Sequence, residues 1–264
     1  MSKGIVEKTM VRRRSVRRVQ TFLLLTPHSS PLTPHPSLLT PHRIKPMSRP
    51  ERVLIDGPSG LIEVFVEPED AATGIALVAH PHPLFGGTAE HKVVTTLARA
   101  FREHGCHALR PNFRGVGASE GEHDNGGLET DDLLAVLEYA HVRFGKMPVY
   151  LAGFSFGAYV ITRLAKRLQD SGNPAQRLVL VGTAAGYVEG ARHYTSEAVA
   201  ADTVVIHGAE DETVPLKNVL EWALPLNLPV VVIPGADHFF HGRLQLIRDI
   251  VQRALAPPRP VMPM

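Results

Sequence analysis

Cysteine is almost absent from this sequence of 264 residues: Cys106 stands alone, which excludes a disulfide within the chain. No Cys/His spacing typical of a zinc site occurs either. Hydrophobic residues make up 44% of the chain, yet no apolar run approaches the about 18 residues that a membrane span needs. We therefore expect a globular protein with a sizeable core and no membrane partner. A single cysteine suits a reducing compartment, and we predict a cytoplasmic location.

Acidic residues are scarce at the start of the chain. Residues 1–46 contain nine lysines and arginines and one acid, Glu7, which leaves 19 basic and 25 acidic residues in 47–264. The formal net charge of +2 therefore hides a body with a net charge of −6. Nothing in an acidic body suggests a nucleic-acid ligand, and we expect no nucleic-acid partner.

Residues 1–46 also differ from the body in composition. Thr-Pro-His recurs every seven residues, beginning at Thr26, Thr33 and Thr40, in a stretch crowded with proline and serine. Proline at this density blocks helices and sheet ladders. We interpret 1–46 as a disordered or mis-assigned N-terminal extension, with Met47 as the natural start; an Arg-rich transit peptide is the alternative. The folded domain is predicted to span 47–264.

From residue 52 onward, short apolar runs alternate with longer amphipathic ones. The strands that we expect are Arg52–Ile55, Leu61–Val66, Gly74–His80, Cys106–Asn112, Pro148–Ala152, Arg177–Val181, Thr203–His207 and Pro229–Ile233. The helices that we expect are His91–His104, Thr130–Phe144, a helix from Ser155 to about Leu168, Leu216–Ala223 and Arg243–Leu255. This alternation predicts an α/β fold: a doubly wound, mostly parallel sheet of about eight strands with helices on both faces. The interval 182–202 has room for one or two short helices, so we expect little or no cap domain.

The sequence Gly153-Phe154-Ser155-Phe156-Gly157 lies between an expected strand and an expected helix. A strand that turns directly into a helix strains the turning residue and crowds the residues two before and two after it, where glycine fits. This G-x-S-x-G spacing is typical of a nucleophile elbow. A glycine-flanked serine in an ordinary turn is the alternative. The flanking strand and helix favour the elbow, with Ser155 as nucleophile.

A serine nucleophile needs a base, and the base needs an orienting carboxylate. Asp211 follows the expected strand Thr203–His207, and His238 follows the strand Pro229–Ile233. Because the carboxyl ends of parallel strands share one edge of the sheet, both side chains can meet Ser155 there. Either residue alone could be a solvated acid or a core histidine. Their order and their places after the strands favour a triad.

Hydrolysis also needs backbone N–H groups that stabilise a developing oxyanion. Phe156 begins a helix, so its N–H has no acceptor within that helix. In the loop after Gly74–His80, Pro81 and Pro83 lack an N–H, which leaves His82 as the second expected donor. His80 and His82, with His91 nearby, also allow a metal site. Because prolines flank the pair and no acidic ligands are near, we expect no metal.

Together these motifs resemble the α/β-hydrolase superfamily, and in particular small bacterial His-Pro-His-Pro hydrolases akin to dienelactone hydrolase. The resemblance rests on His80-Pro-His-Pro, Asn112-Phe-Arg-Gly-Val-Gly-Ala-Ser119, Gly153-Phe-Ser-Phe-Gly157, His207-Gly-x-x-Asp211 and Gly235-Ala-Asp-His238. It covers roughly residues 52–256 and implies Ser155 as nucleophile, Asp211 as acid and His238 as base. Dienelactone hydrolase has cysteine at the elbow where this chain has serine, so its substrate does not carry over.

We therefore expect a carboxylesterase-like serine hydrolase that cleaves small esters, lactones or thioesters through an acyl-enzyme on Ser155. A small-substrate peptidase or amidase with the same triad is one alternative. A non-catalytic binding protein on the same scaffold is another, because a fold does not determine a function. We expect a small-molecule acyl substrate and no cofactor. The oligomeric state is left open.

Overall fold

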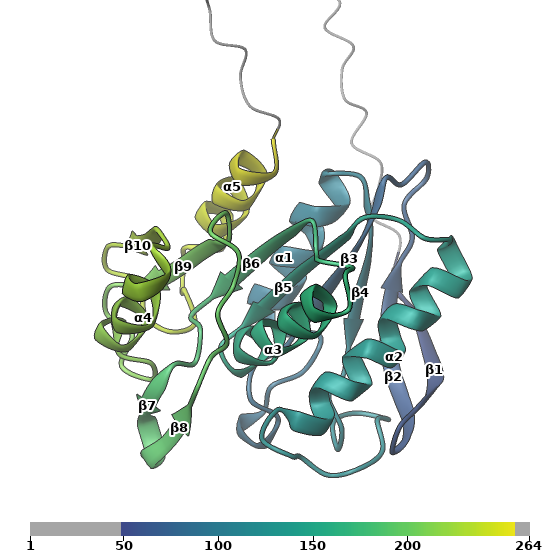
Figure 1. Ribbon diagram of the computed structural model, residues 1–264, viewed down its shortest axis with the longest axis horizontal. Coiled ribbons are helices and arrows are strands. Elements are labelled where there is room, and N and C mark those ends of the chain that lie inside the picture. The colour runs from purple at the N-terminus through teal and green to yellow at the C-terminus, as the bar shows by residue number, and fades with distance from the viewer. Residues whose placement is uncertain (1–48, 257–264) are drawn as a thin grey trace, which may run out of the picture. The chain divides into compact units, whose positions relative to one another are not determined.

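The computed structural model describes residues 49–256, so the interpretation of 1–46 lies outside the described residues. Within 49–256, eight strands form one sheet in the order β1-β2-β4-β3-β5-β6-β9-β10 (Figure 1). They are β1 (Glu51–Gly57), β2 (Gly60–Glu67), β3 (Gly74–Ala79), β4 (Cys106–Pro111), β5 (Val149–Phe154), β6 (Arg177–Val181), β9 (Val204–Gly208) and β10 (Val230–Ile233). β2 pairs antiparallel with β1 and β4, and the remaining pairs are parallel. The predicted fold class is confirmed.

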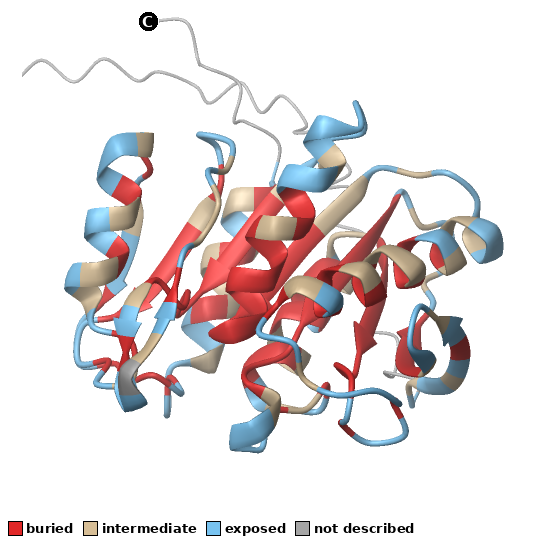
Figure 2. Cartoon of the chain, turned by 60° about the horizontal axis from the view of Figure 1, so that its bottom comes forward, coloured by how far each residue is buried: buried red, intermediate tan, exposed pale blue. Residues whose placement is uncertain are grey.

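Helices cover both faces of this sheet. They are α1 (Lys92–Glu103), α2 (Gly127–Phe144), α3 (Phe156–Asp170), α4 (Leu216–Ala223) and α5 (Leu244–Leu255). Buried residues of α2, α3 and α4 belong to one hydrophobic cluster, and those of α1 and α5 belong to a second. The central strands β3 and β4 are buried along their whole length (Figure 2). Burial from both sides explains why β3 is apolar throughout, without alternation. β4 also carries two buried polar residues, His107 and Arg110.

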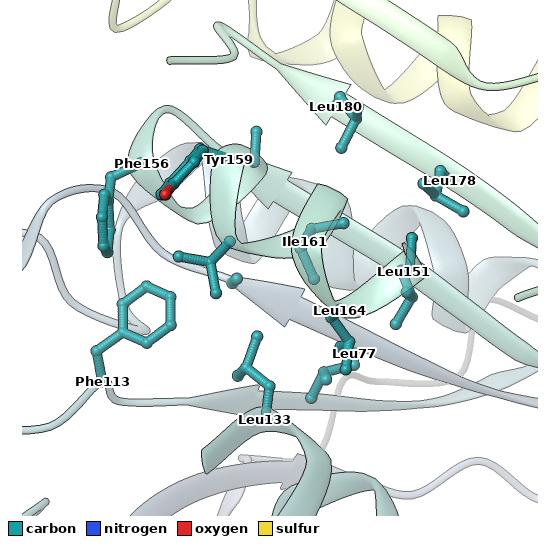
Figure 3. Close-up of a cluster of buried hydrophobic side chains, with 14 of the residues drawn as sticks. Leu77, Phe113, Leu133, Leu151, Phe156, Tyr159, Ile161, Leu164, Leu178 and Leu180 are labelled. Atoms are coloured by element: carbon teal, nitrogen blue, oxygen red, sulfur yellow. The ribbon is translucent and has the colours of Figure 1, made fainter. Parts of the chain in front are cut away.

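The core beneath the site packs α3 onto the centre of the sheet. Leu77 of β3 and Leu151 of β5 lie in one cluster with Ile161 and Leu164 of α3 (Figure 3). All four side chains are fully buried. Burying a leucine or isoleucine contributes about 1.5–3 kcal/mol relative to exposure, so these contacts fix helix α3, which follows Ser155 directly.

The segment between β6 and β9 differs from the prediction. The sequence leaves room there for one or two short helices, and the structure instead has the hairpin of β7 (Gly186–Val188) and β8 (Arg192–Tyr194), joined by the 3-10 turn η2 (Glu189–Ala191). The physical reason is local. Gly186 and Gly190 have φ values of 63° and 76°, which break a helix and suit a turn. The prediction of little or no cap domain is confirmed: within 49–256 this hairpin is all that the interval adds.

Helix α2 begins at Gly127, three residues before the predicted start at Thr130. The Glu129 carboxylate accepts hydrogen bonds from the N–H groups of Asp124 and Gly126, both at 2.8 Å. These bonds satisfy donors that the helix start would otherwise leave unpaired. No helix in the part of the chain that the structure describes is long and apolar enough to cross a bilayer.

Candidate active site

Ser155 lies between β5 and α3 with φ 55° and ψ −120°, a strained conformation for a residue with a side chain. Its N–H donates to the carbonyl of Val181 at 2.9 Å, which anchors the turn. A Cβ atom at Gly153 would lie 2.5 Å from the carbonyl carbon of Gly157, and one at Gly157 would overlap the carbonyl oxygen of His80. Both flanking glycines are therefore required sterically, as the elbow spacing predicts.

The structure brings Ser155 together with His238 and Asp211. His238 Nε2 lies 2.9 Å from Ser155 Oγ, and His238 Nδ1 lies 2.7 Å from Asp211 Oδ2. All three residues are buried. A carboxylate can only accept, so Nδ1–H donates to Asp211, and Nε2 is left to accept the proton of the serine hydroxyl. This is the arrangement that a serine nucleophile needs.

The Asp211 carboxylate is held by more than His238. Its Oδ1 accepts the N–H of Val214 at 2.7 Å. The ring of His207 is fully buried behind it: Nε2–H donates to the carbonyl of Val214 at 2.9 Å and lies 3.4 Å from Asp211 Oδ2. Burial lowers the pKa of His207, which favours a neutral ring. His207 thus closes the loop that carries the acid, while the neighbouring Glu210 and Glu212 are exposed.

Sequence reasoning counted His207 only as part of the His-Gly-x-x-Asp motif. His207 is the penultimate residue of β9 and lies four positions before Asp211, and this position was the signal that could have identified it.

The two predicted oxyanion residues lie beside the serine. Phe156 is the first residue of α3. His82 lies in the loop after β3, and its carbonyl accepts the N–H groups of Phe85 and Gly87, each at 3.1 Å. The rings of His82 and Phe156 contact each other, with centroids 4.9 Å apart. Burial is the main cause that lowers the pKa of His82 to about 4, so this ring is neutral at pH 7. The roles of their N–H groups stay predictions.

The other two histidines of the loop make bonds to the backbone. His80 donates from Nδ1 to the carbonyl of Pro81 at 2.6 Å and accepts at Nε2 from the N–H of Phe113 at 2.9 Å. Burial lowers the pKa of His80 to about 3. His91 caps α1, accepting the N–H of Val93 at 3.3 Å. Among residues 49–256, no three His, Cys, Asp or Glu side chains gather in a group that could hold a metal ion.

A cavity of about 350 Å³ opens onto Ser155 and His238. Its walls come from the loop after β3, from the β7–β8 hairpin and from the loops that carry the acid and the base. The lining residues are Pro81, His82, Phe85, Gly86, Gly87, His91, Ser155, Glu189, Gly190, Arg192, Thr213, His238 and Phe239. The volume is near the low end for small-molecule sites. Arg192 and Glu189 could not be recognised as site residues from the sequence, where they lie within the interval 182–202.

The loop after β4 supports the site without lining the cavity. Arg114 donates two hydrogen bonds to the buried Asp132 carboxylate, at 2.9 and 2.8 Å. Ser119 Oγ accepts the N–H of Glu63 and donates to the carbonyl of Asn112. The loop is tied to β2 and α2 by these bonds, which are structural.

Comparison with known proteins agrees with this geometry. A model of the alpha/beta hydrolase fold family matches residues 84–194. An alpha-beta serine hydrolase homologue from Coxiella burnetii is 40% identical, with a TM-score of 0.69; the match covers 78% of this chain and 97% of that one. A serine hydrolase without a lid from Xanthomonas campestris is 35% identical with a TM-score of 0.69, over 80% of this chain and 98% of that one. The chain therefore belongs to the α/β-hydrolase superfamily, and its fold and these relatives identify it as a hydrolase.

Curated relatives match over shorter segments. A lysophosphatidylserine lipase, ABHD12 from Danio rerio, is 35% identical over 91 residues, which are 34% of this chain and 23% of that protein. The chain spans half or less of the length of the curated relatives it matches. The likeness to dienelactone hydrolase stays a prediction.

Proposed function

We propose that the protein is a serine hydrolase that cleaves small esters, lactones or thioesters through an acyl-enzyme on Ser155. The observation that carries this proposal is the continuous pair of hydrogen bonds from Ser155 Oγ to His238 Nε2 (2.9 Å) and from His238 Nδ1 to Asp211 (2.7 Å). A buried serine bonded in this way has a base at hand for its proton. The small volume of the adjoining cavity favours a small acyl group.

In the first half of the reaction, Ser155 Oγ attacks the acyl carbonyl carbon while His238 Nε2 takes the hydroxyl proton. The carbonyl π electrons move to oxygen, where the N–H groups of Phe156 and His82 are the proposed donors. When the tetrahedral intermediate collapses, the bond to the leaving group breaks and His238 returns the proton to it. Asp211 keeps the imidazole in the Nδ1–H tautomer and stabilises its positive charge.

In the second half, water replaces the leaving group. His238 takes a proton from water, the hydroxide attacks the acyl carbon, and the bond to Ser155 Oγ breaks as the serine regains its proton. Amide hydrolysis uses the same steps, so a small-substrate amidase is the alternative within this mechanism. The lysophosphatidylserine lipases among the relatives support the ester reading over the amide one, because a lipase cleaves esters.

The test combines active-site labelling with turnover. A fluorophosphonate probe should label Ser155, and peptide mass spectrometry would locate the labelled residue. Ser155→Ala should lose both the labelling and the hydrolysis of 4-nitrophenyl butyrate. The loss expected is on the order of 10⁶-fold in kcat. Ser171→Ala, which changes an exposed serine at the end of α3, is the matched control and should keep both. Wild-type turnover by Ser155→Ala would refute the proposal.

A further inference from the structure

The β7–β8 hairpin places a guanidinium at the wall of the same cavity that holds Ser155. Arg192 is the first residue of β8, and its Nε and Nη2 both donate to the carbonyl of Glu189, at 3.0 and 2.8 Å. Its Cζ lies 4.3 Å from the centre of the ring of Phe85, a residue of the loop after β3. Both residues line the cavity. The hairpin carbonyl and the ring therefore hold the guanidinium in a defined place.

Neither of these partners neutralises the charge of Arg192. A backbone carbonyl and an aromatic ring are uncharged, and no ion pair joins Arg192 to a carboxylate of residues 49–256. Glu189 also borders the cavity, but its side chain is exposed, where solvent screens a charge strongly. The cavity wall thus carries a fixed positive charge.

Two histidines that line the cavity, His82 and His91, do not add to that charge at pH 7. Burial lowers the pKa values of both His82 and His91. For His82, the positive charge of Arg192 is a further, smaller cause in the same direction. The field of the guanidinium therefore reaches the loop that holds the proposed oxyanion donor.

We propose that Arg192 is an anion-recognition residue, and that the cavity takes acyl esters carrying a carboxylate or phosphate group. This inference rests on the proposed hydrolase function and names its substrate class. A guanidinium presents five N–H donors in a planar fork that matches both anions, and the Glu189 carbonyl engages two of its nitrogens. Because Arg192 contacts the substrate rather than the reacting atoms, it determines specificity.

The experiment compares matched pairs of substrates that differ by one anionic group. The first arm uses mono(4-nitrophenyl) glutarate against 4-nitrophenyl pentanoate, which places a carboxylate on the acyl side. The second uses 1-butyrylglycerol 3-phosphate against 1-butyrylglycerol, which places a phosphate on the leaving group. The readout in each arm is the ratio of kcat/KM for the anionic ester to kcat/KM for its neutral partner. The arm in which Arg192 affects this ratio identifies the source of the anion.

Arg192→Gln should lower the ratio about 10-fold in at least one arm, the size expected for losing a charge-assisted hydrogen bond at a partly exposed site. Arg192→Lys keeps the charge and should recover most of the ratio. Arg253→Gln makes the same charge change at an exposed residue of α5 outside the cavity lining, and should leave the ratio as in wild type. If Arg192 had only a structural role, its loss would lower kcat/KM equally for the anionic and the neutral ester of a pair. An unchanged ratio in both arms therefore overturns the inference.

Two further measurements keep the result decisive. In the wild-type protein, raising the salt concentration from 0.02 to 0.5 M should lower the ratio, because ions screen the guanidinium; this requires no variant to fold. Binding of monomethyl glutarate and methyl pentanoate to Ser155→Ala, with and without Arg192→Gln, is measured by calorimetry. If wild type hydrolyses no ester but Ser155→Ala binds the anionic one through Arg192, the proposed function fails and the inference stands. If esters are hydrolysed with no preference for the anionic one at either salt concentration, the function stands and the inference fails.

Discussion

Two aspartates of this protein are buried and hydrogen-bonded through both carboxylate oxygens, yet only one of them is linked to Ser155 through a histidine. Asp132 on α2 accepts hydrogen bonds from the Arg114 guanidinium at 2.9 and 2.8 Å. Asp211, in the loop after β9, accepts from His238 Nδ1 and from the N–H of Val214, both at 2.7 Å. Both residues show only a few per cent exposure. Burial and pairing alone therefore do not distinguish an active-site acid from a structural one.

The difference lies in the partner. A guanidinium only donates and stays protonated, so the Arg114–Asp132 pair ends there. The imidazole has a second nitrogen, and His238 Nε2 lies 2.9 Å from Ser155 Oγ, so hydrogen bonds link Asp211 to the serine through the ring. Burial raises the pKa of Asp132, and the adjacent Arg114 guanidinium opposes part of this rise.

Within this comparison of the two aspartates, the largest effect is expected at Asp211. Asp211→Asn removes the acceptor that keeps His238 in the Nδ1–H tautomer, so kcat for a 4-nitrophenyl ester should fall about 10⁴-fold. Thermal unfolding followed by circular dichroism would verify that the variant remains folded. A loss of less than about tenfold in a folded variant would contradict the role of Asp211.

Asp132→Asn should show the opposite pattern. It leaves the buried Arg114 charge without its carboxylate, so the free energy of unfolding should fall by about 3 kcal/mol, while kcat stays within a few-fold of wild type. Urea titrations of both asparagine variants, with kcat measured in parallel, test the comparison directly. If Asp132→Asn lost turnover and kept its stability, the two sites would not differ as we describe.

His80 is a buried histidine that bonds to backbone groups and not to Ser155. His80 has a pKa of about 3 in the folded protein, against about 6.5 in the unfolded chain. Below pH 6.5 the unfolded state therefore binds a proton that the folded state does not, and stability is lost as the pH falls towards 3. From this residue alone, the free energy of unfolding should be about 2 kcal/mol lower at pH 5 than at pH 7.

Urea unfolding at the two pH values measures this difference, and His80→Gln should reduce it. His193→Gln, at an exposed histidine of β8, is the control and should keep the wild-type difference. An equal pH dependence in wild type and His80→Gln would show that another group is responsible.

The smallest effects are expected beside the acid. Glu210 and Glu212 flank Asp211 in sequence, but both are exposed and only Asp211 contacts His238. Glu210→Gln and Glu212→Gln should change kcat/KM by less than about twofold, since screened surface charges act weakly on a buried ring. Their kinetics beside those of Asp211→Asn test the assignment. A large loss in either glutamine variant would move the acid from Asp211 to a neighbour.

Local patterns carried most of the prediction of the fold. Apolar runs that are buried from both sides, such as Gly74–Ala79, are readable because their environment is the same along the strand. The elbow was also readable, because close packing of Gly153 and Gly157 leaves room for glycine only. Ser155, Asp211 and His238 could be named since each follows a strand, and parallel strands end at one edge. Their catalytic roles stay predictions until the variants are measured.

The remaining features depend on contacts between distant segments. The sequence leaves room for one or two short helices where the structure has the β7–β8 hairpin, because the turn depends on two glycine φ values and on the packing of Val188. Nothing local indicates that Arg192 would meet Phe85, more than a hundred positions earlier, or that both would line one cavity with Ser155. Strand periodicity and the elbow are properties of neighbouring residues, and the sequence determines them by itself. Tertiary structure decided the shape of the cavity, its charge, and the different partners of Asp132 and Asp211. Each of these depends on which side chains the sheet brings within a few ångströms.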